Sequence, residues 1–222
     1  MMRDWFEWLR GLKHRGFIGP KYHGLVGKAR LQMQGWFGHI EIVSYAEREW
    51  WERPAVPNPA VELVVASSFE EVAPFLVEMK EAYSRSFAKE WKTYFEWGQV
   101  ATLVFLEGRL AGFGWIQDGS KGASAPYLPL FPGEFRSLRA GVLPSFRGKH
   151  VHTTRHVLLL DYLFSKGARR VYVDAFEDNE YSWRGAHKAG YREIGKIHVK
   201  TTLRGRTYVR WITRSSPGKG KE

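Results

Sequence analysis

Two strand-like segments joined by an apolar helical segment constrain the fold of this chain most strongly. Residues 135–143 have the pattern of a strand, and residues 151–165 contain the apolar run VLLLDYLF of a helix. Residues 170–176 (RVYVDAF) alternate β-branched and aromatic side chains, which is typical of a second strand. A strand, a helix and a strand in direct succession form a right-handed crossover between parallel strands. The chain is therefore expected to contain a parallel pair of strands.

The segments on either side of this crossover predict antiparallel hairpins. Turn residues Glu107-Gly108-Arg109 and Arg204-Gly205 each separate two apolar runs. The other elements expected after residue 60 are strands at 61–66, 102–106, 110–116, 191–201 and 207–213, and helices at 68–83, 88–97 and 179–190. This order predicts an α/β (α+β) fold, with a mixed central sheet that carries helices on both faces.

The first 59 residues differ from the rest and are expected to form an N-terminal extension. Residues 1–35 hold seven Lys or Arg against two acids, together with six glycines that interrupt regular structure. Residues 38–45 (GHIEIVSY) read as a strand, and residues 53–59 (RPAVPNP) hold three prolines, which mark a boundary. We therefore expect an extension over 1–59, a folded domain over 60–214 and a disordered tail over 215–222.

Composition excludes several classes of protein. The chain has no cysteine, which rules out a disulfide scaffold, a thiolate zinc site and a cysteine nucleophile. It has no run of 18 apolar residues, and its charged start, MMRDWFEWLRGLKHR, lacks the pattern of a signal peptide. A cytoplasmic protein is expected. The net charge of +11 attracts polyanions, among them nucleic acid, acidic lipid and phosphorylated cofactors.

The most informative stretch is GVLPSFRGKHVH at residues 141–152, which runs from a strand through a turn into a helix. Pro144 ends the strand, and Arg147-Gly148-Lys149 places two cations and a flexible backbone just before the helix. Free N–H groups and the helix dipole make such a position a site for an anion. A basic surface turn is the alternative, but the position inside a crossover favours an anion site.

With these residues the chain resembles the GNAT superfamily of N-acetyltransferases. The family pattern is a strand, V-x-P-x-x-R-G-x-G-x-G/A, a helix, a strand, then N-x-x-[AS] and a helix that ends K-x-G-[FY]. The chain matches it over about residues 60–214. The matching residues are Val142, Pro144, Arg147, Gly148, Lys149, Asn179, Ser182, Lys188, Gly190 and Tyr191. The turn looks closest to the R-G-K-G-I-Y-P type, some members of which serve surface-polysaccharide synthesis.

The resemblance implies that acetyl-CoA is the acyl donor. Backbone groups of Ala140 and Val142 would pair with pantetheine as if it were an added strand, and Asn179 would touch the donor from the next helix. The two strands of the crossover would splay apart to admit it. The pyrophosphate would lie on the N–H groups of Arg147, Gly148, Lys149, His150, Val151 and His152.

Two departures from the family pattern concern the turn and the catalytic groups. His150 and His152 replace the second and third glycines of the turn, which makes a positive φ costly there. The Tyr that often protonates the thiolate is Ala186 here, and the usual position of the base falls near Arg136, a cation. Glu134 and Asp174 are the candidate bases, acting through a relayed water; the alternative is that the site only positions an amine that is already neutral.

Other clusters give weaker signals. His152 and His156 have metal-ligand spacing, but no nearby carboxylate completes a site, so no metal is expected. On the last hairpin, alternation places Arg206, Arg210 and Arg214 on one face with Tyr208. This pattern is typical of a solvated outer face. Nucleic acid is not favoured as a partner, because no nucleic-acid motif accompanies these arginines. Residues 1–35 either contact an anionic membrane or pack on protein; a helix with Trp5 and Trp8 on one face fits both.

These observations predict an N-acetyltransferase that acts on a primary amine. The turn resemblance favours an amino sugar of an envelope polysaccharide as the acceptor. One alternative is a non-catalytic module with the same fold that binds CoA or an anionic partner without turnover, because the usual acid and base are missing. A second alternative is a basic binder of nucleic acid or membrane that uses no CoA.

Overall fold

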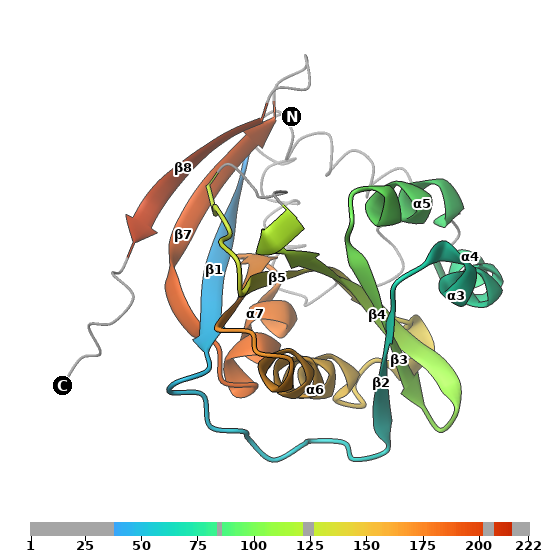
Figure 1. Cartoon of the computed structure of the whole chain (residues 1–222). Helices are drawn as coiled ribbons and strands as arrows, with labels where there is room; N and C mark the ends of the chain where they lie inside the picture. Colours follow the sequence, from blue (N-terminus) through green and yellow to red (C-terminus); the bar gives the residue numbers. More distant parts are fainter. Residues whose placement is uncertain (1–37, 84–85, 122–126, 202–206, 215–222) are drawn as a thin grey trace, which may run out of the picture.

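An eight-stranded mixed sheet forms the centre of the computed structural model, which describes residues 38–83, 86–121, 127–201 and 207–214 (Figure 1). The strands lie in the order β2-β3-β4-β5-β6-β1-β7-β8, and only β5 and β6 are parallel. Their bounds are β1 His39–Glu47, β2 Val61–Ala66, β3 Val100–Leu106, β4 Arg109–Asp118, β5 Glu134–Val142, β6 Arg170–Phe176, β7 Arg192–Thr201 and β8 Thr207–Arg214. The helices are α3 Phe69–Val72, α4 Leu76–Tyr83, α5 Ala88–Glu96, α6 Val151–Ser165 and α7 Glu180–Lys188.

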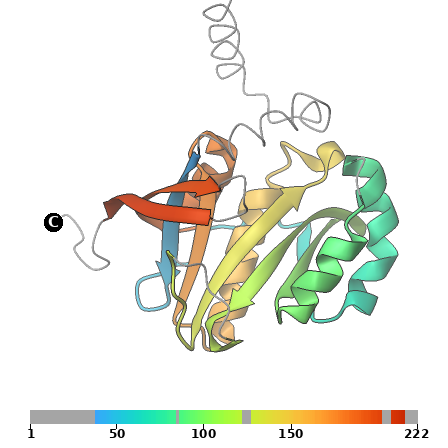
Figure 2. The ribbon, with the colours of Figure 1, turned by 90° about the horizontal axis from the view of Figure 1, so that it is seen from above.

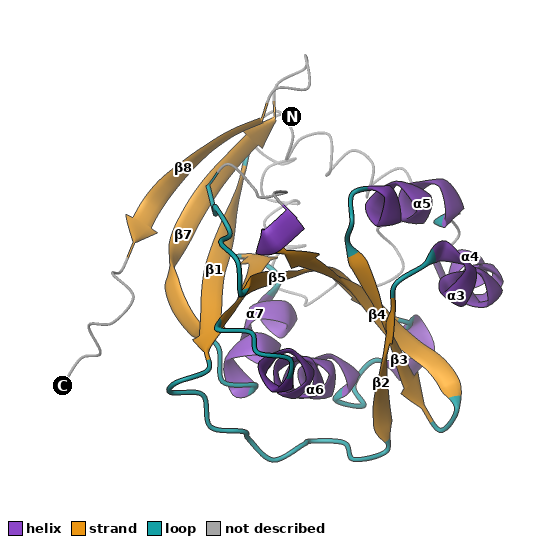
Figure 3. Cartoon of the chain, in the orientation of Figure 1, coloured by secondary structure: helices purple, strands orange, loops and turns teal. Residues whose placement is uncertain are grey.

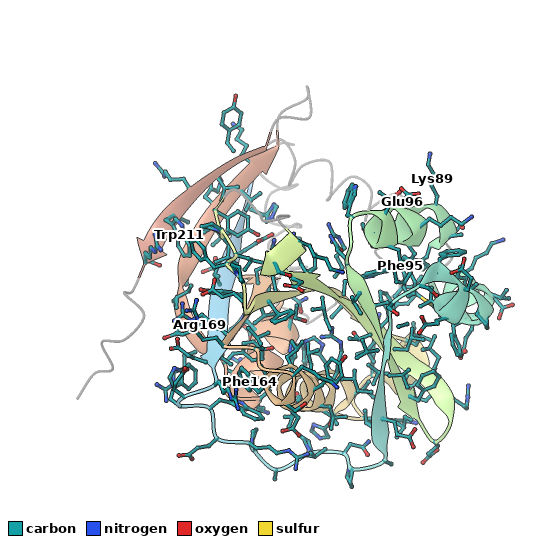
Figure 4. The ribbon with its side chains drawn as sticks, in the orientation of Figure 1. Lys89, Phe95, Glu96, Phe164, Arg169 and Trp211 are labelled. Carbon is teal, nitrogen blue, oxygen red and sulfur yellow. The ribbon has the colours of Figure 1, made fainter. Side chains whose placement is uncertain are left out.

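Helices cover the sheet from both sides, as expected. Helices α6 and α7 lie together on one face, and α3, α4 and α5 form a separate group (Figure 3). Trp91 and Tyr94 of α5 pack edge-on against Trp115 of β4, with ring centroids 5.1 and 4.9 Å away. Figure 4 shows Phe95 directed toward the sheet, whereas Lys89 and Glu96 point away from it. The same helix thus has an aromatic core face and a charged outer face.

Most predicted elements are confirmed within a few residues. The hairpin turn at Glu107 and Gly108 has positive φ at both residues (54° and 72°), which matches the right-handed twist of the flanking strands. The helix predicted over 68–83 is interrupted. Ser68 caps α3, as expected, but Pro74 lies in a 3₁₀ turn, Ala73–Phe75, that separates α3 from α4.

The boundary expected at residue 59 is corrected, because β1 belongs to the folded sheet and not to a separate extension. The predicted strand forms β1, but it lies inside the sheet, antiparallel to β6 on one side and to β7 on the other. Figure 2 shows β1 and β8 at one side of the molecule and the helices of residues 69–96 at the other. A boundary at residue 59 therefore does not separate β1 from the folded sheet. Residues 1–37, with the predicted helix and its membrane contact, lie outside the described residues, as does the tail 215–222.

The segment that joins β1 to β2 packs on the domain. The indole N–H of Trp51 donates to the carbonyl of Ala189 at 2.9 Å, and its ring lies against Phe164 of α6. A Cβ at Gly190 would lie 2.8 Å from this ring, so glycine permits the contact. Trp51 therefore packs on the folded domain.

The last hairpin has the expected alternation where it is described. Arg210 and Arg214 are exposed with Tyr208, while Val209 and Trp211 pack on the core beside β1 and β7. Arg206 lies outside the described residues. No helix in the described part of the chain has the length and apolar character needed to cross a membrane.

Candidate functional site

A fork between the parallel strands β5 and β6 is the main feature of the site. Residues Glu134–Ser137 of β5 pair with Arg170–Val173 of β6, and the pairing ends there. Beyond Ser137, the remaining residues of β5, including Ala140 and Val142, have no partner on β6. Leu138, Gly141 and Val142 keep their pairing with β4, whereas Arg139 and Ala140 lie where that register is interrupted. Backbone polar groups on that side of β5 are left for another strand-like ligand.

A β-bulge shapes β5 just beyond the apex of this fork. The register of β4 and β5 shifts between Phe113 and Trp115, and Arg139 has a φ of 50°. The Arg139 guanidinium lies 4.2 Å from the centre of the Tyr94 ring and donates to Gln99 at 3.1 Å. These contacts hold a conformation that is uncommon for a residue other than glycine.

The turn after β5 leads into the N-terminus of α6, as predicted. Residues Arg147 to His150 are all exposed. Gly148 has a φ of 79°, and His150, the N-cap, has a φ of 60° and forms no side-chain cap. The amides at the start of α6 therefore have no capping acceptor, and the helix dipole adds positive potential beside two cations. Asn58, from the proline-rich segment, braces this turn by donating to the carbonyl of Lys149 at 3.0 Å.

The strain at His150 gives a first prediction. A side chain at a φ of 60° is costly, and glycine adopts this conformation without that cost. We expect His150→Gly to raise the free energy of unfolding by up to about 1 kcal/mol. Chemical denaturation measures this, with His198→Gly as a comparison that is expected to destabilise, because His198 lies at an ordinary strand position in β7. Destabilisation by His150→Gly would show that the side chain, rather than the backbone, holds the turn.

The side chains of His152 and Asn179 both contact Ser182 at the start of α7. The His152 ring is partly buried, with its Nε2 3.5 Å from Ser182 Oγ, and desolvation together with the charge of Arg155 lowers its pKa to about 4. Gly185 leaves room for this ring, since a Cβ there would lie 2.9 Å from it. Asn179 Oδ1 accepts the amide of Ser182 and caps α7. His152 and Asn179, which were both expected to bind the donor, thus use their side chains for contacts between α6 and α7. No group of side chains suited to hold a metal ion occurs in the described ranges.

On the sheet face opposite α6, two carboxylates meet near the apex. Asp174 is the first residue of β6 beyond the last parallel pair, and its Oδ1 accepts from Arg136 Nε at 2.6 Å. Glu41 of β1 is a diagonal neighbour of Asp174 on the same face, because Val43 pairs with Asp174 and Glu41 with Phe176. Arg136 also donates to the hydroxyl of Tyr127. The mostly buried cluster has two acids and one Arg.

Glu41 is poised to hold a proton. Its Oε1 is 2.9 Å from His39 Nε2, and its Oε2 is buried and has no hydrogen-bond partner among the described residues. Burial raises the pKa of Glu41, and Asp174 adds to the rise, whereas the hydrogen bond to His39 opposes it. A carboxylate with a raised pKa and an oxygen that forms no hydrogen bond is suited to accept a proton.

The other candidate base, Glu134, lies at the closed end of the parallel pair. Its carboxylate accepts from Arg169 at 2.8 Å, from Arg170 at 3.4 Å and from the amide of Phe131 at 3.2 Å. Arg169 is labelled beside this end of the sheet in Figure 4. The structure thus separates Glu134 from Asp174, and the ion pairs of Glu134 hold the loop before β5 against the start of β6.

At the vacant tyrosine position, Ala186 is buried in α7. The neighbouring His187 does not point to the fork, because its Nε2 lies 3.0 Å from Ser44 Oγ on β1. Sequence reasoning missed Glu41, whose only signal is an acid within the strand pattern HIEIVSY. It also missed Arg155, a cation within an otherwise apolar helix face.

A model of the acetyltransferase (GNAT) family matches residues 68–191. Among solved structures, a GCN5-related N-acetyltransferase from Sphaerobacter thermophilus is 14% identical, with a TM-score of 0.51 over 86% of this chain and 58% of that one. A glucosamine N-acetyltransferase region of a fungal multi-domain β-N-acetylglucosaminidase is 11% identical, with a TM-score of 0.54 over 77% of this chain and 22% of that one. An aminoglycoside acetyltransferase solved with coenzyme A and kanamycin is 17% identical, with a TM-score of 0.50 over 69% of this chain and 95% of that one.

No curated protein matches the chain at a comparable level. The chain spans only 58% of the length of the Sphaerobacter protein, and at these identities the likeness shows the fold. The family model is more specific, because it covers the stretch from the N-cap of α3 through the fork and turn to the residue before β7. That stretch is more than half of the chain, and the protein therefore belongs to the GNAT acetyltransferase family.

Proposed function

We propose that the protein transfers an acetyl group from acetyl-CoA to the nitrogen of a primary amine. The observation that carries this proposal is the fork, which combines an unpaired strand edge, an uncapped helix N-terminus at one end and a carboxylate pair at its apex. The family uses acyl-CoA donors, and the residues present fit one.

The donor would be held mainly by backbone groups. Ala140 and Val142 would pair with the pantetheine arm on the side of β5 that lacks a β6 partner. The amides of residues 147–152 would bind the pyrophosphate, and Arg147 and Lys149 would add charge from exposed positions. Asn179, at the start of α7, would lie beside the donor. Tyr83 donates to the carbonyl of Val142 at 2.8 Å and keeps the end of β5 in place.

The carboxylate pair would supply the base. In the transfer, the lone pair of the amine forms the new C–N bond, the C–S electron pair leaves with the sulfur, and one proton leaves the nitrogen. Glu41 and Asp174 would attract the ammonium form of the acceptor and take up protons as it is converted to the amide. Arg136 holds Asp174 in place, since the two are joined by a charge-assisted hydrogen bond.

An amino sugar is the acceptor class that we favour. A pocket of about 180 Å³ adjoins the carboxylate cluster through Tyr127, and aromatic side chains and a few charged groups line it, as is typical of small-molecule sites. Its lining includes Tyr172, Trp211, Arg170 and Glu134. The glucosamine and kanamycin named with two of the similar structures are amino sugars or contain them, which supports the same class.

Charge reversal in the turn tests donor binding. We expect Arg147→Glu with Lys149→Glu to weaken acetyl-CoA binding at least about tenfold, because each charge-assisted bond to phosphate contributes roughly 1.5–3 kcal/mol. Isothermal calorimetry measures the affinity. Lys166→Glu with Lys188→Glu is the matched control, since both lysines are exposed at the C-terminal ends of α6 and α7 and the net charge changes equally. Equal affinity of the two double variants would place the donor elsewhere.

Thiol release with a panel of amines tests the transfer itself. We expect release from acetyl-CoA with glucosamine or a related amino sugar. The missing tyrosine at Ala186 favours a second candidate function, a module that binds CoA without turnover. Acetyl-CoA binding without release for any amine would support that second function, and absence of binding would contradict both.

A further inference from the structure

Arg155 is a fully buried cation that has no carboxylate partner in the described part of the chain. Its side chain is 1% exposed, and among the described residues only neutral hydroxyls bond to it. Its Nε and Nη2 donate to Thr102 Oγ1 at 3.1 and 2.9 Å, and its Nη1 donates to Ser137 Oγ at 3.1 Å. Burial of an uncompensated charge costs free energy, so a structural role alone would favour an apolar side chain here.

The guanidinium lies against the sheet at the apex of the fork. Ser137 belongs to the last parallel pair of β5 and β6. Gly114, opposite the bulge of β5, makes the space for Arg155, because a Cβ at Gly114 would lie 2.1 Å from Arg155 Nη2. Arg155 thus reaches the apex from the face that carries α6 and α7, whereas Asp174 and Glu41 lie on the other face.

Ser137 connects this charge to the apex. Its hydroxyl oxygen accepts the bond from Arg155, and within the described part of the chain its own hydrogen has no acceptor. A hydroxyl that accepts from a cation is polarised and becomes a stronger donor. A buried donor without an acceptor is costly unless a ligand supplies one.

We propose that the Ser137 hydroxyl donates a hydrogen bond to the sulfur of the acyl donor as the thiolate departs, and that Arg155 is the positioning residue that orients and polarises it. The proposal rests on the proposed acetyl transfer. It assigns to Ser137 the position in the reaction that Ala186 leaves vacant. The C–S electron pair stays on the sulfur, the amine proton goes to the carboxylates, and solvent protonates the free thiol after release.

Three ionisable groups near Arg155 in the described part of the chain, His152, His156 and Tyr191, carry no charge at neutral pH. His152 is partly buried and His156 fully buried, and both are neutral because desolvation lowers their pKa. The Tyr191 hydroxyl keeps its proton because burial raises its pKa. Burial also lowers the pKa of Arg155, to about 10, which still leaves it charged at neutral pH. On the other face, Glu41, Asp174, Arg136 and Tyr127 surround the acceptor side.

The thiol pKa of bound CoA tests the proposal without any acceptor. Titration of the full-length protein saturated with CoA, followed by the ultraviolet absorption of the thiolate, gives this pKa directly. We expect a value at least about one unit below that of free CoA, because a cation and a donor favour a thiolate. Ser137→Ala and Arg155→Met are each expected to remove most of the shift. Ser44→Ala is the matched control, since it removes a buried hydroxyl on β1 that bonds His187 rather than Arg155, and it is expected to keep the shift.

Each outcome decides between the two proposals. An unshifted thiol in the wild-type complex, or an equal loss of the shift in Ser44→Ala and Ser137→Ala, would overturn the role of Ser137 while donor binding stands. Failure of CoA to bind would instead contradict the proposed function. If Arg155→Met does not fold, Ser137→Ala still decides, because it removes a single oxygen and creates no buried charge.

Discussion

A chain that begins at Pro59 is expected not to form a soluble folded protein. The deletion removes β1, and with it both the antiparallel partner of β6 and that of β7. The sheet would be cut between the half that carries the fork and the half that carries β7 and β8. Two long strand edges would be exposed, which favours aggregation.

The magnitude of this effect follows from the burial of β1. Val43 and Ala46 are fully buried, and Ile42 and Tyr45 are 5% and 6% exposed. Burial of one large apolar side chain contributes about 1.5–3 kcal/mol. The loss of these residues, together with two rows of hydrogen bonds, therefore rivals the whole stability of an ordinary domain, about 5–15 kcal/mol.

Size-exclusion chromatography and thermal melting measure the loss of solubility and stability in two truncations, one that begins at Pro59 and one that begins at Gly38. A chain that begins at Gly38 keeps β1 and is the matched control, because it lacks only residues outside the described ranges. A soluble chain from Pro59 with a cooperative melt would show that β1 is dispensable.

The local pattern predicted the elements but not the place of β1. Residues 38–45 alternate as a strand does, and the proline-rich segment after them resembles a linker. Pairing of β1 with β6 and β7 joins segments more than 120 residues apart, for example Val43 with Asp174, and no local signal specifies such a partner. The strand order of the fork was predictable because the crossover from β5 to β6 is itself a local connection.

The candidate site likewise contains residues that could be predicted from local sequence and residues that could not. The turn and its helix could be predicted, since they depend on backbone conformation and on adjacent residues such as Gly148. The glycine replacement at His150 was identified as costly, and its φ is indeed positive. Glu41 and Arg155 could not be predicted, because their roles depend on which strands lie beside them. Asp174 and Glu134 look equivalent in the sequence, and only the structure separates an acid at the apex from one in an ion-pair cluster.

The central position of β1 also has a consequence for the site. It places Glu41 beside Asp174 on the acceptor face, at the end of β6 where the fork opens. The same strand contacts α7 on its other face, where Ser44 meets His187. A strand from the start of the described chain thus completes both the sheet and the acidic cluster.

The last prediction concerns this acidic cluster. We expect Asp174→Asn and Glu41→Gln to lower kcat about 10²-fold or more, because general-base catalysis contributes about 10²–10⁴-fold. Affinity for acetyl-CoA should change little, since the donor is expected on backbone groups of β5 and α6. Glu62→Gln is the control: it removes an exposed carboxylate from the edge strand β2, away from the fork, and should leave kcat unchanged.

The pH dependence separates a base from a purely structural acid. A base works without its proton, so the raised pKa of Glu41 should place the acid limb of the kcat/KM profile above the ordinary glutamate value of 4.5. The folded state also binds this proton more tightly than the unfolded chain, so stability is lost as pH rises through the pKa of Glu41. Glu41→Gln should therefore remove the limb and stabilise the protein at neutral pH while it lowers kcat. Full activity of both Glu41→Gln and Asp174→Asn across the pH range, with normal melting, would show that neither carboxylate accepts the proton.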